Sequence, residues 1–133
     1  MSLVYFVLLL SLLQFFLFGI QVGNARRRFG VPAPATSGHP DFERVFRVQM
    51  NTLEQLALFV PSLLLFAHLV DERWAAWLGI VYLIGRQLYS RGYAQAAAKR
   101  SLGFAVSSLP VMILLVGSLV AAGMAAWRDA GLG

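Results

Sequence analysis

The sequence predicts an all-α integral membrane protein, a bundle of four transmembrane helices. Of its 133 residues 59% are hydrophobic, and the mean hydropathy is +0.70. Only 13% are charged, about half the proportion typical of soluble domains. Since one crossing takes about 20 residues, four spans with short loops use nearly the whole chain. We therefore expect a single membrane domain over residues 1–133, with no separate soluble catalytic domain.

The first helix is expected over residues 2–25, which contain no charged residue. A secretory signal has a basic start and a small-residue cleavage site. The chain starts Met-Ser-Leu-Val, without a basic residue, so we interpret this segment as a retained transmembrane helix. The arginines at 26–28 are expected to fix its end.

The second helix is expected over residues 41–70, after a connector at 29–40 whose prolines and glycines cannot continue a helix. Asp41 and Glu43 fall in its first turn, where acidic side chains suit the helix dipole. Pro61 is a candidate kink.

The last two helices are expected over residues 74–98 and 104–128, and the fourth is uncharged from Phe104 to Trp127. Nine of the 11 basic residues fall in two connections, 26–47 and 86–100. The positive-inside rule places both connections in the cytoplasm and both termini outside. Because these residues interrupt apolar segments, they do not form the soluble basic face typical of a nucleic-acid partner.

Two helices carry a stripe of polar residues close to this basic side. Arg47, Asn51 and Glu54 are spaced i, i+4 and i+7, which places them on one helix face. In the third helix a second face alternates phenols with guanidinium groups, at Tyr82, Arg86, Tyr89, Tyr93 and Arg100. Since ionisable residues in membranes tend to face an interior or a watery cavity, the two stripes predict the walls of one polar cavity.

This cavity is suited to a small anionic ligand that carries several functional groups. Guanidinium groups bind carboxylates in planar, bidentate geometry. Glu54 can pair with a ligand ammonium, and Asn51 and the tyrosines supply hydrogen bonds. An arginine beside a bound thiol also favours the thiolate, which activates a sulfur nucleophile.

Simpler interpretations stand beside these. Arg47 and Glu54 are also compatible with a structural ion pair, and the arginines at 26–28 with topology determinants or contacts to lipid headgroups. Tyr82 suits core packing. The chain has no cysteine and its two histidines lack identifiable partners, so we expect no metal site.

Two segments resemble the MAPEG family, the membrane-associated proteins of eicosanoid and glutathione metabolism. The first comprises NARRRF at 24–29, the connector, and FERVFRVQMNTLE at 42–54. The second is YLIGRQLY at 82–89 followed by Gly92 and Tyr93. The resemblance covers roughly residues 10–115 and implies a four-helix membrane fold, a homotrimer, and glutathione bound between adjacent subunits near the cytoplasmic face.

The resemblance also implies roles for individual residues. Arg47, Asn51, Glu54 and Tyr93 match residues that bind glutathione in the leukotriene-synthesising members. The further contacts to the tripeptide match Arg26, Gln49 and Tyr89. Arg100 matches the arginine that stabilises the glutathione thiolate, and Arg27 a second arginine on the electrophile side.

We accordingly expect a membrane glutathione transferase, with glutathione peroxidase activity on lipid hydroperoxides as an associated activity. Its co-substrate is glutathione, its second reactant a lipophilic electrophile from the bilayer, and its location a bacterial inner membrane or an organelle membrane. Gln55 stands where the close transferase relatives have a tyrosine. The arginine at position 100 is present here, whereas the family's non-catalytic member lacks it. The alternatives are a non-enzymatic lipid-binding or scaffold member of the same family and a small four-helix multidrug exporter.

Overall fold

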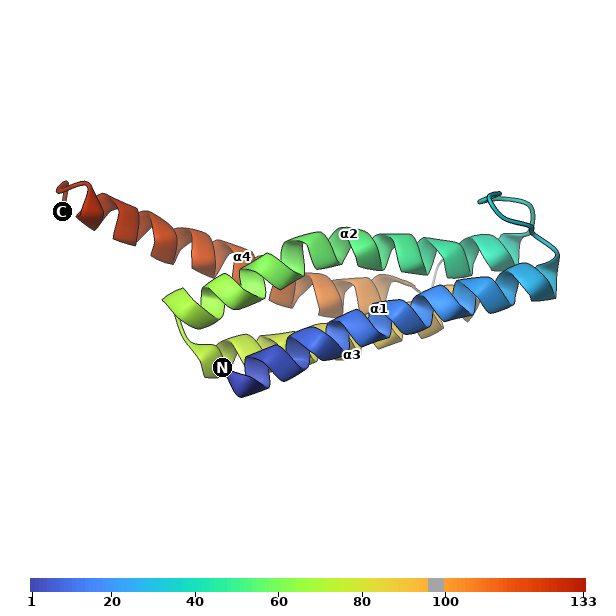
Figure 1. Ribbon diagram of the computed structural model, residues 1–133, viewed down its shortest axis with the longest axis horizontal. Coiled ribbons are helices and arrows are strands. Elements are labelled where there is room, and N and C mark those ends of the chain that lie inside the picture. The colour runs from blue at the N-terminus through green and yellow to red at the C-terminus, as the bar shows by residue number, and fades with distance from the viewer. Residues whose placement is uncertain (96–99) are drawn as a thin grey trace.

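The computed structural model describes residues 1–95 and 100–133, and the secondary structure in these residues is entirely helical apart from turns and connectors. The helices lie side by side along the long axis of the molecule, and α4 extends beyond the others at its C-terminal end (Figure 1). Their bounds are α1 Ser2–Phe29, α2 Pro40–Leu69, α3 Glu72–Gln95 and α4 Ser101–Asp129. The predicted all-α, four-helix fold is confirmed. The expected end of the third helix at residue 98 lies outside the described residues.

The end of α1 differs from the expectation. The helix continues through Arg26, Arg27 and Arg28 and ends at Phe29 instead of residue 25. Arginine is a good helix former, so leaving the apolar layer does not by itself end a helix. The end comes at Gly30, which adopts a left-handed conformation with φ 68° and donates its N–H to the carbonyl of Arg26.

The start of α2 is determined by its capping residue. His39 is extended, and its Nδ1 accepts a hydrogen bond from the Asp41 N–H at 3.1 Å. Pro40 opens the helix, where a missing N–H costs nothing. The helix continues without interruption through Pro61, and its ribbon bends along its length (Figure 1).

Three of the described helices, α1, α2 and α4, are long and apolar enough to cross a membrane. The 24 residues of α3 span about 36 Å at 1.5 Å per residue, which exceeds a hydrocarbon core of about 30 Å. Its composition is more polar because it carries Arg86 and Arg91. Large apolar side chains face outward, as lipid contact requires; Phe16 is 65% exposed and Leu119 68%.

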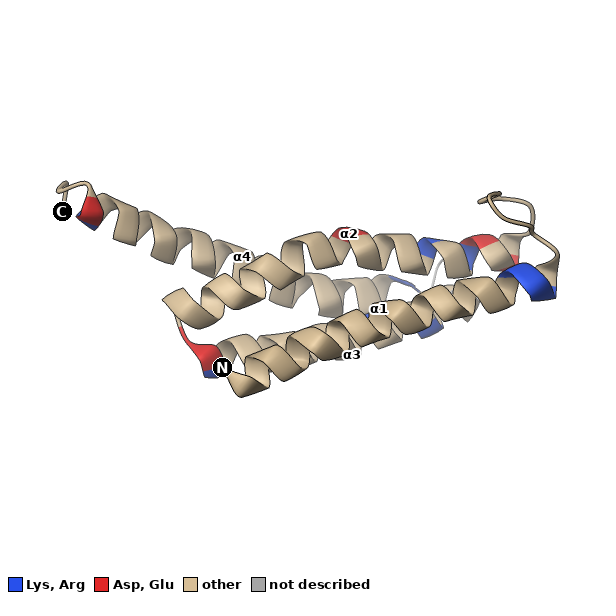
Figure 2. Ribbon diagram, viewed as in Figure 1, with Lys and Arg blue, Asp and Glu red and all other residues tan. Residues whose placement is uncertain are grey.

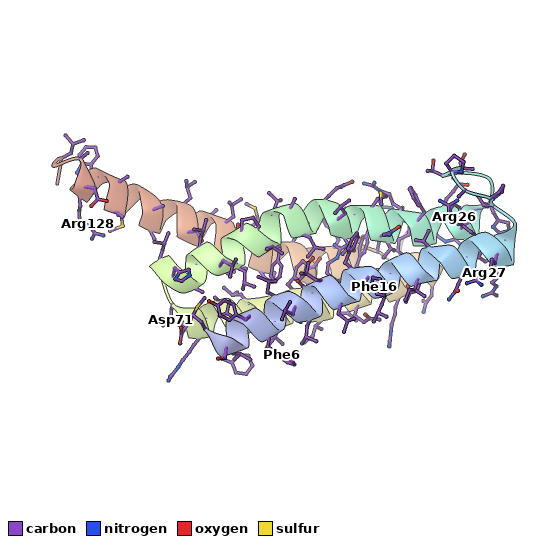
Figure 3. All side chains as sticks on the ribbon, in the orientation of Figure 1. Phe6, Phe16, Arg26, Arg27, Asp71 and Arg128 are labelled. Carbon is purple, nitrogen blue, oxygen red and sulfur yellow. The ribbon has the colours of Figure 1, made fainter. Side chains whose placement is uncertain are left out.

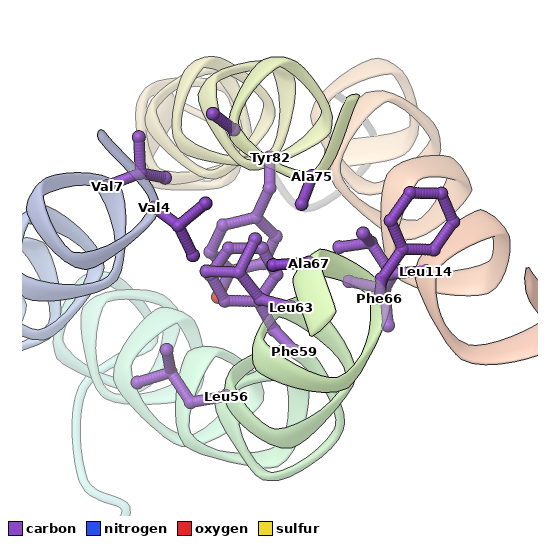
Figure 4. Packing of buried hydrophobic residues seen from close by; sticks show 12 residues of the cluster. Val4, Val7, Leu56, Phe59, Leu63, Phe66, Ala67, Ala75, Tyr82 and Leu114 are labelled. Atoms are coloured by element: carbon purple, nitrogen blue, oxygen red, sulfur yellow. The ribbon is translucent and has the colours of Figure 1, made fainter. Parts of the chain in front are cut away.

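The core of the bundle is aromatic and aliphatic (Figure 4). The rings of Phe59 and Tyr82 stack with centroids 3.9 Å apart, and Leu63 and Leu114 of the same cluster are fully buried. The assignment of Tyr82 to core packing is confirmed.

Glycines let α3 and α4 approach with their backbones almost touching. A Cβ on Gly85 would lie 2.4 Å from the backbone N of Ser107, and one on Gly103 would lie 2.0 Å from the backbone N of Tyr89. Small residues allow such close helix contacts within membranes. This crossing joins the start of α4 to the polar stripe of α3.

Most basic residues gather at the end of the bundle where α1 ends and α2 begins (Figure 2). Arg26 and Arg27 lie at this end, and Asp71 and Arg128 at the opposite one (Figure 3). Lys99, which the sequence assigned to the same basic side, lies outside the described residues. We call this region the basic end; its location in the cytoplasm stays a prediction.

Candidate functional site

A pocket of about 480 Å³ opens near the basic end, between α2, α3 and the start of α4. Its lining combines guanidinium groups, an amide, two phenols, a hydroxyl and one apolar ring. The lining residues are Arg47 and Asn51 of α2, Tyr89 and Tyr93 of α3, and Arg100, Ser101 and Phe104. Five residues of the two polar stripes, namely Arg47, Asn51, Tyr89, Tyr93 and Arg100, therefore meet in one cavity.

The α2 wall of the pocket holds the cation of Arg47 and the amide of Asn51, and the carboxylate of Glu54 lies next to it, paired with Arg47. The guanidinium of Arg47 faces the carboxylate of Glu54 in a fork, with N–O distances of 3.2 and 3.5 Å. Both side chains are about half exposed, at 48% and 56%, so the pair is weak and either group can exchange its partner for a ligand. Asn51 is buried and its Oδ1 has no hydrogen-bond partner. A ligand N–H would satisfy this acceptor.

The opposite wall is aromatic. Tyr89 and Tyr93 meet edge to face with centroids 5.5 Å apart, and Phe104 lies 6.3 Å from Tyr89. The Arg100 guanidinium lies 5.5 Å from the centre of the Tyr93 ring. A cation over a phenol face is attracted by the ring quadrupole, which holds Arg100 at the pocket.

A buried guanidinium lies behind this wall. Arg86 is completely buried and lies 4.2 Å from the centre of the Tyr89 ring. It donates hydrogen bonds to Thr52 on α2 and Ser107 on α4. It does not line the pocket, although the sequence places it on the same stripe as Tyr89 and Tyr93.

Four of the predicted site residues do not line this pocket. Arg26 donates to the carbonyls of Val31 and Ala35 in the connector, at 3.4 and 2.7 Å. Arg27 donates to Asn24 at 2.9 Å on an exposed surface. The Gln49 amide faces α1, 3.1 Å from the point where Gly19 would carry a Cβ. Glu54 reaches the site through its pair with Arg47.

Ser101 and Phe104 line the pocket but were not among the predicted residues. Their positions in the sequence could have indicated them, because Ser101 directly follows Arg100 and Phe104 lies one helical turn after it. A second pocket of about 450 Å³ shares Arg47 and Tyr93 with the first and extends toward the connector. Within residues 1–95 and 100–133, no three His, Asp or Glu side chains come together as ligands for a metal ion.

The fold and the pocket define a helical membrane protein with a basic, phenol-lined site at one end of its bundle. The model of the MAPEG family matches residues 3–120, and the chain belongs to that family.

Several curated relatives share most of the chain. An uncharacterized protein of Synechocystis sp. is 60% identical over 101 residues, which are 76% of this chain and 74% of the relative. Microsomal glutathione S-transferase 2 of Homo sapiens is 41% identical over a match that covers 85% of this chain and 78% of the relative. Leukotriene C4 synthase of Bos taurus is 38% identical over a match that covers 90% of this chain and 79% of the relative. The family resemblance predicted from the sequence is thus confirmed.

Proposed function

We propose that this protein is a membrane glutathione transferase that conjugates glutathione to lipophilic electrophiles from the bilayer. The observation that carries the proposal is the pocket itself, which gathers Arg47, Asn51, Tyr93 and Arg100 around one opening. Similarity to microsomal glutathione S-transferase 2 and leukotriene C4 synthase supports it.

Arg47 and Glu54 match the end of glutathione where a carboxylate and the ammonium group lie together. The tripeptide carries two carboxylates and one ammonium group. Arg47 presents a planar fork that binds a carboxylate in bidentate fashion, and Glu54 beside it accepts the ammonium. The unpaired Oδ1 of Asn51 accepts a further N–H of the ligand. Binding thus replaces a weak internal ion pair with two pairs to the ligand.

Arg100 has the chemistry to activate the thiol. A positive charge close to a thiol lowers its pKa, because the charge stabilises the thiolate. The proton leaves to water through the open side of the pocket. The thiolate lone pair then forms the carbon–sulfur bond while the electrophile's leaving group takes the electrons of the bond that breaks.

The start of α4 supplies the apolar side of the reaction. Phe104 is 42% exposed and belongs to the pocket lining, and Leu102 beside it is 68% exposed. A lipophilic electrophile in the bilayer reaches this surface without crossing water. A site at the boundary between water and lipid therefore brings together two reactants of opposite polarity.

The proposal includes a homotrimer, which the family resemblance implies. Arg26, Arg27 and Gln49 lie outside the pocket of their own chain, and in a trimer they would contact glutathione bound by a neighbouring subunit. The basic end would face the cytoplasm, in accordance with the positive-inside rule.

The test is turnover of glutathione with chlorodinitrobenzene by purified protein, compared with Arg100→Ala. We expect Arg100→Ala to lose most of kcat, whereas Arg91→Ala, an exposed arginine of α3 outside the pocket lining, retains the wild-type rate. Equal rates for wild type and Arg100→Ala would remove Arg100 from the mechanism. No turnover of any electrophile would contradict the assignment as an enzyme, and no measurable glutathione binding would favour the non-enzymatic lipid-binding or scaffold member. Release of the alcohol from a lipid hydroperoxide measures the associated peroxidase activity.

A further inference from the structure

Arg86 is a charged side chain that the proposed mechanism does not use. It has no exposed surface and lies in the centre of the bundle on α3. Its Nη2 donates to Thr52 Oγ1 at 2.8 Å and its Nη1 to Ser107 Oγ at 3.3 Å. Its Nε has no partner.

The surroundings of Arg86 leave its charge largely uncompensated. Both of its described hydrogen bonds go to neutral hydroxyl groups, and its ring contact is to the neutral phenol of Tyr89. The titratable groups that act on it electrostatically are Tyr82 and Tyr89 of α3 and Glu54 of α2. Glu54 is itself paired with Arg47 and more than half exposed, so it offers little compensation.

Such an arrangement is costly. A buried ion requires good compensation, and an apolar side chain of similar volume is often neutral or stabilising in its place. Ionisable residues inside membrane helices accordingly mark functional sites more often than structural ones. The free-energy cost of burying Arg86 therefore indicates that this residue has a function beyond packing.

The pocket lies directly next to this charge. Thr52 accepts a hydrogen bond from the Arg86 guanidinium and directly follows Asn51, which lines the pocket. The Tyr89 ring separates the Arg86 guanidinium from the cavity. The backbone of Tyr89 is in turn pressed against Gly103 of α4. Arg86 thus contacts α2, α4 and the Tyr89 ring of α3 close to the cavity, without being part of the cavity lining.

We propose that Arg86 is a positioning residue of the pocket: it fixes the Tyr89 phenol from behind and adds a buried positive potential that favours the thiolate of the bound ligand. This inference rests on the proposed function, since it concerns glutathione in that pocket. Arg100 would then act at the opening and Arg86 from the interior, where screening by salt and water is weaker.

The size of the effect follows from Coulomb's law. If the sulfur of the bound ligand lies about 10 Å from the guanidinium, at an effective dielectric constant of about 20 to 40, the charge shifts the thiol pKa by about 0.6 to 1.2 units. Removing the charge should therefore raise the pKa of the bound thiol by about one unit. The other charged or titratable groups that face this part of the site are Tyr82, Tyr89, Tyr93, Glu54, Arg47 and Arg100, and all of them are left unchanged.

The experiment is an ultraviolet titration of thiolate absorbance in purified protein saturated with glutathione. Arg86→Gln and Arg86→Met remove the charge, and Met is the variant more certain to fold because it fills the same space without a polar group. Arg86→Lys keeps the charge, and Arg91→Gln is the matched control for loss of an exposed arginine on the same helix. Thermal unfolding is measured on each variant.

We expect both neutral variants to raise the bound-thiol pKa by about one unit, with Arg86→Lys and Arg91→Gln staying within about half of that shift. A changed unfolding temperature with an unchanged thiol pKa in the neutral variants would overturn the inference and leave Arg86 a structural residue. If the wild type binds glutathione but the pKa of the bound thiol is no lower than that of free glutathione, the inference fails although binding is intact. If the wild type binds no glutathione, the proposed function itself fails and the inference falls with it.

Discussion

Gly103 is the position where a single methyl group most directly couples packing to the site. In Gly103→Ala the new Cβ would lie 2.0 Å from the backbone N of Tyr89 and 2.3 Å from its Cα. Ordinary van der Waals contact starts at 3.4 Å, so α4 must move away from Tyr89 by about 1.4 Å to restore it. Both contacts are to backbone, which cannot turn aside as a flexible side chain would.

The expected cost combines two opposing effects. Overpacking costs up to about 3 kcal/mol, and replacing glycine by alanine within a helix recovers about 1 kcal/mol. The net loss of stability is therefore up to about 2 kcal/mol. A displacement of this size next to Tyr89, Ser101 and Phe104 should also lower kcat/KM for conjugation about tenfold to a hundredfold.

The matched control is Gly123→Ala on the same helix, where an added Cβ would meet nothing within 4 Å. Thermal unfolding in detergent and initial rates of conjugation are measured for both variants. We expect Gly123→Ala to unfold at the wild-type temperature or above it, with an unchanged rate. Wild-type stability and rate in Gly103→Ala would refute the close α3–α4 crossing on which the site geometry depends.

Three further changes have defined outcomes. Leu114→Ala empties a fully buried position and should cost about 2 to 5 kcal/mol, whereas Leu119→Ala, at a position 68% exposed, should leave the unfolding temperature unchanged; similar shifts for both would contradict the described core. His39→Ala removes the cap of α2 and should speed proteolysis of the connector, and His39→Asn, which restores an acceptor, should slow it again. Glu54→Gln breaks the fork with Arg47 and should weaken glutathione binding several-fold in calorimetry, while an unchanged affinity would exclude Glu54 as the partner of the ligand ammonium.

Much of the fold follows from the sequence because apolar runs of the length of a bilayer have few alternatives. The end of α1 was missed for a physical reason: three arginines leave the apolar layer but remain good helix formers, and only the left-handed Gly30 ends the helix. The approach of α3 to α4 was equally hidden. Gly85 and Gly103 are visible in the sequence, but the backbones that they meet are set by three-dimensional packing.

The site shows the same division between local and long-range information. The spacing of Arg47, Asn51 and Glu54 places them on one face, and the structure joins two of them in an ion pair. The contacts of Arg26 depend on the path of the connector, whose carbonyls it binds, and no helical period describes that path. Full burial of Arg86 depends on hydroxyl groups supplied by two other helices, so its place on a stripe could not distinguish lining from support.

The measurement that tests the central claim most directly is calorimetric titration of glutathione into the purified protein and into Arg47→Ala and Arg91→Ala. Arg47 lines the pocket, whereas Arg91 is an exposed arginine outside the pocket lining. Loss of a charged, bidentate contact costs about 1.5 to 3 kcal/mol, equivalent to a factor of about 10 to 150 in affinity. We predict saturable binding to the wild type and to Arg91→Ala, with at least tenfold weaker binding to Arg47→Ala. Equal affinities for all three proteins, or no binding to the wild type, would contradict the assignment of this pocket to glutathione.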